Sequence, residues 1–96
     1  MEINLTVIIK SKSEYREELK SVLFDLSKNS NEETACIQYD LHQDIEEPNV
    51  FILHEVWESI EGLDLHKEQA HLLKFNEVLE LFLEEKIKVF ITSRIG

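Results

Sequence analysis

Apolar side chains recur with two different periods along this chain, and the two periods separate extended segments from helical ones. Residues 1–10 are rich in β-branched and apolar types at both alternating positions, which predicts a strand buried on both faces. Residues 36–43 alternate strictly, as a half-buried strand does, and residues 50–57 resume an apolar strand after a polar turn. We therefore expect an antiparallel hairpin over residues 36–57 and a last strand over residues 87–93.

Two further regions follow the 3.6-residue period of an amphipathic helix. The first has Ser11 and Ser13 as candidate N-caps and is expected to end in the polar stretch 27–34. Its apolar stripe consists of Tyr15, Leu19, Val22, Leu23 and Leu26. The second region has Ser59 as a plausible N-cap and restarts its apolar stripe near residues 68–70, which predicts a kink or break there.

The resulting order, β-α-β-β-α-β, is typical of a ferredoxin-like α+β fold, an antiparallel four-stranded sheet with its helices on one face. The predicted first, third and fourth strands carry apolar side chains on both faces, so the face without helices also needs a cover. A second sheet from another copy of the chain is the most economical cover. We expect a single domain over residues 1–96 that forms a homodimer.

Composition narrows the class of protein. The 96 residues include 20 acidic and 10 basic side chains, for a formal charge of −10. Such a surface lacks the clustered lysine and arginine that bind nucleic acids or anionic membranes, so neither partner is expected. The single cysteine, Cys36, excludes an intramolecular disulfide and a cysteine-rich zinc site. No basic signal segment or membrane-length apolar run is present, and a cytoplasmic location is expected.

Short motifs along the chain resemble the antibiotic biosynthesis monooxygenase (ABM) domain in their order and spacing. These are Cys36-x-x-Tyr39-x-Leu41, Glu55-x-Trp57-x-Ser59, and Leu63-x-x-His66 with a downstream His71. The Pro-Gly that usually precedes the cysteine is replaced by Thr34-Ala35, which changes the turn into the strand but not the chemistry. The resemblance extends over essentially the whole chain.

The resemblance implies a dimeric α/β barrel and, in the best-known members, oxygenation of phenolic, anthrone or quinol substrates without a cofactor. A deprotonated substrate of this kind can donate an electron to O₂, so neither flavin nor metal is required. The protein must remove a proton and hold the ring in a dry cavity. The prediction is a monooxygenase acting with O₂ on a small quinol-like or polycyclic phenolic compound. A non-oxidative isomerase acting on a small carbonyl compound and a non-catalytic ligand-binding dimer are the alternatives.

His66 is the predicted general base, because imidazole titrates near neutral pH and this position often holds a histidine in the family. A helix-surface or capping histidine is the structural alternative. His71 follows five residues later, roughly 140° around a continuous helix, so only a break near Ala70 would bring both rings to one cavity. His71 is predicted to bind substrate in that case, and is otherwise a polar residue at the start of a helix.

Other residues are predicted to complete the site. Glu55 and Asn4 are candidate catalytic residues: a carboxylate on an apolar strand face needs a partner or a raised pKa, and a carboxamide can bind a substrate oxygen. Glu55 is expected to orient a histidine or to pair with Arg94 or a lysine across the dimer. The pocket is predicted to be lined by Trp57, Tyr39 and Phe75. The structural alternatives are that Trp57 fills the core, that Tyr39 packs with its hydroxyl at the rim, and that the Asn4 side chain is solvated.

No metal site is expected from the sequence. His42 and His54 share a strand face and could meet across the hairpin, but without a carboxylate or thiolate partner they indicate a surface pair. The haem-degrading branch of the family resembles a pattern with tryptophan near the position of His66 and a haem-ligating histidine about ten residues further on. This chain has His66 and Asn76 there, so haem degradation is disfavoured.

Overall fold

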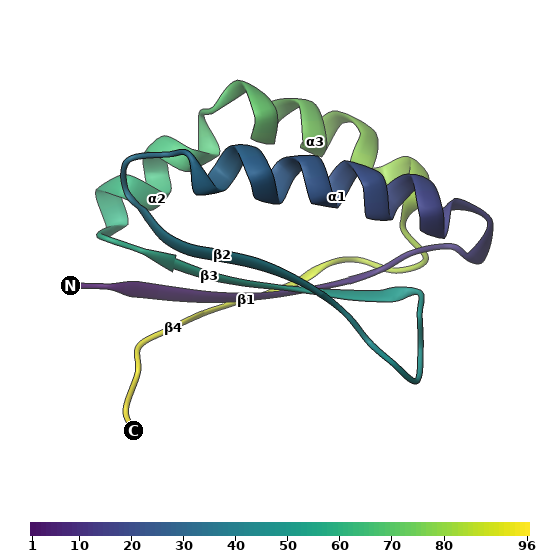
Figure 1. The fold of residues 1–96 in the computed structure, drawn as a ribbon, viewed down its shortest axis with the longest axis horizontal. Coiled ribbons are helices and arrows are strands. Elements are labelled where there is room, and N and C mark those ends of the chain that lie inside the picture. The colour runs from purple at the N-terminus through teal and green to yellow at the C-terminus, as the bar shows by residue number, and fades with distance from the viewer.

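The computed structural model describes residues 1–96 as one antiparallel sheet with all helices on one of its faces (Figure 1). The strands are β1 (Ile3–Lys10), β2 (Cys36–Gln43), β3 (Val50–Trp57) and β4 (Lys88–Thr92), and the helices are α1 (Arg16–Asn31), α2 (Ile60–Lys67) and α3 (Ala70–Phe82). The sheet order is β2-β3-β1-β4, with every neighbouring pair antiparallel. The predicted ferredoxin-like fold is confirmed.

The core is a single layer between the sheet and the helices. Every second residue of β1 faces the helices, and β1 pairs with β3 so that Leu5 lies opposite Glu55. The buried apolar residues of this layer come mainly from β1, β3 and α1, namely Ile3, Leu5, Val7, Ile9, Phe51, Leu53, Trp57, Leu19, Leu23 and Leu26. The other face of the sheet has no helix over it (Figure 1). No helix is both long and apolar enough to cross a membrane.

The first helix begins differently from the prediction, and it ends, as predicted, within the polar stretch 27–34. Ser11 is not an N-cap: it is buried, and its hydroxyl donates a hydrogen bond to the carbonyl of Lys12 at 2.8 Å. A short 3-10 helix, Ser13–Tyr15, then leads into α1 without a side-chain cap. At the other end α1 continues to Asn31, because its last polar side chains dock on β2. Asn31 Nδ2 donates to the carbonyl of Tyr39 at 2.8 Å, which a solvated turn would not do.

The start of β2 also departs from strict alternation. The pairing shifts between Cys36 and Gln38, so Ile37 is the additional residue of a β-bulge. Ile37 is therefore half exposed instead of sharing the buried face with Tyr39, as the pattern predicted. The bulge leaves Tyr39 opposite Glu55 and beneath the helices.

The second helical region is broken as expected. Ser59 caps α2 by accepting a hydrogen bond from the Gly62 amide at 3.1 Å. The α2 helix ends at Lys67, and Gln69 is the N-cap residue of α3. Gly62 allows α2 to lie directly on the segment before β2, since a Cβ at this position would stand 2.5 Å from the Cβ of Ala35.

Candidate active site

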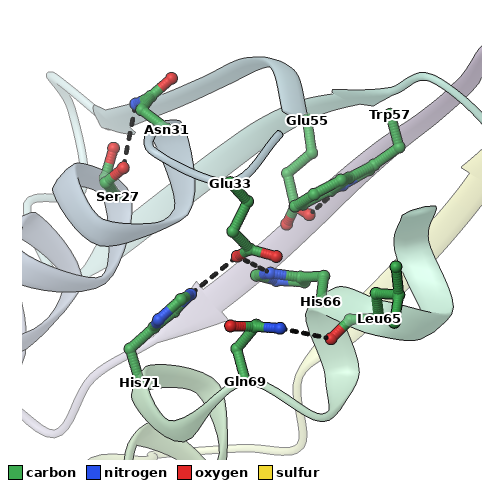
Figure 2. A network of polar contacts seen from close by, with 9 residues as sticks. All are labelled: Ser27, Asn31, Glu33, Glu55, Trp57, Leu65, His66, Gln69 and His71. Carbon is green, nitrogen blue, oxygen red and sulfur yellow. Dashed lines mark hydrogen bonds and ion pairs between the residues drawn. The ribbon is translucent and has the colours of Figure 1, made fainter. Parts of the chain in front are cut away.

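Two histidines from different helices meet at one carboxylate oxygen (Figure 2). Glu33 Oε2 lies 2.6 Å from His66 Nδ1 and 2.7 Å from His71 Nε2. Because a carboxylate oxygen accepts hydrogen bonds, both ring nitrogens carry the proton in these contacts. His66 therefore holds its proton on Nδ1, and Nε2 is left with a free lone pair.

Local chain geometry explains this meeting. Glu33 lies in the turn between α1 and β2, where its amide donates to the Ser30 carbonyl and its carbonyl accepts from the Cys36 amide. His66 is in the last turn of α2 and His71 in the first turn of α3. The helix break between them replaces the roughly 140° offset of a continuous helix, so both rings reach the same carboxylate.

The His66 ring is held between the sheet and the helices. It is 3% exposed, and its centroid lies 4.4 Å from that of Trp57 and 5.8 Å from that of Tyr39. Burial lowers the pKa of His66, and the Glu33 carboxylate opposes this shift in part. The imidazole is therefore held mainly in its neutral form at neutral pH, as a base requires.

An apolar cavity of about 160 Å³ lies between the sheet and the helices. Eleven of its 15 lining residues are hydrophobic, among them Leu5, Leu63, Leu72, Phe75 and Val89. The buried polar side chains of the lining are Tyr39, Glu55 and His66, whereas Lys67 and Asn76 are exposed. The cavity thus presents an apolar space with three polar groups on its inner wall.

Burial raises the pKa of two of these polar groups. The pKa of Glu55 is raised to about 7, mainly by burial, although the Trp57 indole opposes the shift by donating a hydrogen bond to Glu55 Oε1 at 2.9 Å. Burial also raises the pKa of the Tyr39 hydroxyl far above its usual range. The cavity wall therefore combines a neutral imidazole with a phenol and, below about pH 7, a carboxylic acid.

The structure brings together most of the residues predicted for the site. Tyr39, Glu55, His66 and Phe75 all line the apolar cavity. Trp57 is fully buried and does not line it; the indole instead stacks behind His66 and binds Glu55 (Figure 2). Within the chain, Glu55 is therefore bound to Trp57 and not to a histidine.

Two further predicted residues lie outside the cavity. His71 approaches Glu33 from the polar side of the cluster and is not part of the cavity lining. Asn4 does not join the cluster, because the alternation of β1 turns Ile3 and Leu5 toward the helices and Asn4 toward the opposite face. The predicted pair of His42 and His54 does form, with ring centroids 5.6 Å apart.

Glu33 is the site residue that sequence reasoning missed. It stands in a polar stretch with another glutamate beside it, and no spacing or motif sets it apart from a solvated turn. Its role depends on α2 and α3 folding back over the α1–β2 turn, a contact between residues more than thirty positions apart.

The fold and the site define a small α+β domain with an apolar cavity of the size of a small ligand. The sequence model of the family described as antibiotic biosynthesis monooxygenase matches residues 3–78, and the chain belongs to this family. The protein named "Putative monooxygenase YcnE" from Bacillus subtilis (strain 168) is 37% identical over 73 residues, which cover 76% of this chain and 77% of that protein.

Solved structures share the whole fold. PA3566 from Pseudomonas aeruginosa superposes with a TM-score of 0.93 at 29% identity, covering 99% of this chain and 95% of that one. Rv0793 from Mycobacterium tuberculosis gives a TM-score of 0.94 at 19% identity, covering 100% of this chain and 97% of that one, and at this identity it shows likeness of fold alone.

Proposed function

We propose that this protein is a cofactor-independent monooxygenase that oxidises a small quinol with O₂. The observation that carries the proposal is the His66 imidazole, tied through Nδ1 to Glu33 and lining an apolar cavity with its other nitrogen free. Family membership supports the monooxygenase class. The general base is thus the pair Glu33–His66, in which the carboxylate fixes the ring and its tautomer.

The reaction follows from these groups. His66 Nε2 takes a proton from a quinol hydroxyl, and the resulting anion donates an electron to O₂. Recombination forms a C–O bond and a peroxide on the ring. Loss of the ring proton at that carbon, with cleavage of the O–O bond, leaves one oxygen on the product, a hydroxyquinone, and releases the other as water. Tyr39 and the protonated Glu55 stabilise the negative oxygens by donating hydrogen bonds in a low-dielectric cavity.

Cavity size favours a substrate with one ring. A cavity of about 160 Å³ is close to the roughly 150 Å³ known to hold benzene, and a tricyclic anthrone would need Phe75 or its neighbours to move. Of the substrate sizes expected from the sequence, the structure therefore supports a monocyclic quinol.

We also propose that the protein acts as a homodimer. The sheet face opposite the helices includes the half-exposed Phe90 of β4 and the partly buried Ile8 and Ile52. A second sheet packed on this face would remove these apolar groups from water.

The test is oxygen uptake by chelator-treated protein with benzoquinols, naphthoquinols and anthrones, after subtraction of autoxidation. We expect uptake with the benzoquinols, and a large loss of kcat in His66→Ala and Glu33→Gln. Glu32→Gln is the matched control, since this exposed neighbour forms no hydrogen bond or ion pair with either histidine. Wild-type rates in His66→Ala would refute the assignment of the base. Conversion of a carbonyl substrate without oxygen uptake would support the isomerase alternative.

A further inference from the structure

We propose that Glu33, His66 and His71 form a binding site for one divalent cation of the Zn²⁺, Co²⁺ and Ni²⁺ class, and that the bound cation switches off His66 as a base. The cation site does not depend on the proposed function, whereas the inhibition of His66 by the cation rests on that function. The three ligand atoms, Glu33 Oε2, His66 Nδ1 and His71 Nε2, all lie within 4.8 Å of one another.

The donor set matches this class of cation. Imidazole nitrogens and a carboxylate oxygen are the ligands that Zn²⁺ and its neighbours prefer. The two protons that now join both rings to Glu33 Oε2 would leave when the cation binds. Ligand atoms of a tetrahedral site with bonds of about 2.0–2.2 Å stand roughly 3.3–3.6 Å apart, so the distance from Glu33 Oε2 to each nitrogen must lengthen by roughly 0.7 Å or slightly more. Because His66 is packed against Trp57, the Glu33 side chain and His71, at the start of α3, would make this adjustment.

An open polar pocket gives the cation access. This pocket of about 530 Å³ is lined by Glu33 and His71 together with Glu32, Glu58 and Gln69, and it includes no lysine or arginine. Its carboxylates attract cations, and its volume leaves room for a water molecule as the fourth ligand. The pocket is separate from the apolar cavity, with which it shares no residue. The cluster therefore faces solvent on one side and the cavity on the other.

Coordination would change the tautomer of His66. In the contact with Glu33, the proton is on Nδ1 and the Nε2 lone pair is free to accept a proton from substrate. A cation on Nδ1 requires that nitrogen to be unprotonated, so the neutral ring must carry its proton on Nε2 instead. The nitrogen available to the cavity then donates a hydrogen bond and can no longer remove a proton. Cation binding at the polar pocket thus inhibits the chemistry in the apolar cavity.

Co²⁺ is the probe for the site, because its visible absorption reports nitrogen and oxygen coordination directly. We expect one Co²⁺ per wild-type chain, displaced by Zn²⁺. His71→Gln removes the metal-binding nitrogen, while the glutamine amide can still donate a hydrogen bond to Glu33. This substitution and Glu33→Gln should each weaken Co²⁺ binding at least tenfold. The control is His42→Ala, which alters the other histidine pair. Far-UV circular dichroism establishes that each variant is folded.

Each outcome decides one part of the proposal. Failure of folded wild-type protein to bind Co²⁺, or binding lost in His42→Ala and kept in His71→Gln, overturns the site. Oxygen uptake by the wild-type protein should stop when one equivalent of Zn²⁺ is added and return when a chelator is added. The rate of His71→Gln with Zn²⁺ should equal the rate of the same variant without Zn²⁺. Bound Zn²⁺ with unchanged uptake overturns the switch. If no quinol is oxidised in any form, the proposed function fails, while Co²⁺ binding still decides the site.

Discussion

Glu55 makes the stability of this protein depend on pH, and Glu55→Gln should remove that dependence. The carboxyl is 4% exposed, and its pKa is raised from 4.5 to about 7. Since an unfolded glutamate ionises near pH 4.5, the folded state holds an additional proton between about pH 4.5 and 7. Stability is then complete below pH 4.5 and falls as the pH rises through 7, with no further loss above it. At 1.36 kcal/mol per pKa unit, the loss amounts to about 3 kcal/mol.

Glutamine is nearly the same size and can still accept the hydrogen bond from the Trp57 indole, but it has no proton to lose. Urea unfolding of both proteins at pH 5 and pH 8, at one fixed protein concentration, measures the effect. Glu55→Gln should gain about 2–3 kcal/mol relative to wild type between the two pH values, and most of this gain should appear between pH 5.5 and 7.5. A difference between the two proteins that is the same at both pH values would show that Glu55 is not a buried, neutral carboxyl.

Three other predictions concern packing. Gly62→Ala should push α2 away from the α1–β2 turn and lower both the urea midpoint of unfolding and the kcat. Adding Ala35→Gly should restore much of both values, because the clash is between the Cβ atoms of residues 62 and 35. Phe75→Ala should destabilise the fold by about 3–5 kcal/mol. Because it enlarges the cavity, it should also raise the kcat/KM for naphthoquinol relative to benzoquinol, and unchanged selectivity would show that the substrate binds elsewhere. Phe90→Lys should convert the proposed dimer to monomer in sedimentation experiments without changing the circular dichroism of the chain. A dimer that this substitution leaves intact would exclude this sheet face as its interface.

The sequence was sufficient for the fold because its apolar periods agree with the packing. The half-buried alternation of residues 36–43 and the second stripe from Leu72 onward each specify one element and one buried face. The helix break was also predictable, since the apolar stripe of α2 does not continue in phase into α3. Ser11 and Ile37 were misassigned because tertiary contacts decide them: a bridge from Ser11 to Leu83 and a bulge at Ile37.

The candidate site was only partly predictable for a related reason. The sequence identified His66, Glu55 and Tyr39 because they belong to motifs or interrupt an apolar pattern. Both features can be recognised from the sequence alone. Glu33 interrupts nothing: it is one acidic residue among several in a turn, and only the folded chain sets it between two histidines. Asn4 lies outside the site for a different reason. The alternation of β1 shows which residues share a sheet face with Asn4, but it does not show which of the two sheet faces the helices cover.

The position of β1 in the sheet also determines when folding can be completed during synthesis. β1 is the first strand made, yet one of its edges pairs with β3 and the other with β4, where Asn4 lies opposite Thr92. At about 5–20 residues per second, synthesis of the segment from β3 to β4 takes roughly 2–6 s, and throughout it one backbone edge of β1 lacks its partner. The nascent chain thus exposes a strand edge next to apolar side chains until its last strand arrives. Deletions that shorten β4 should therefore reduce the soluble yield more than the small number of lost contacts suggests.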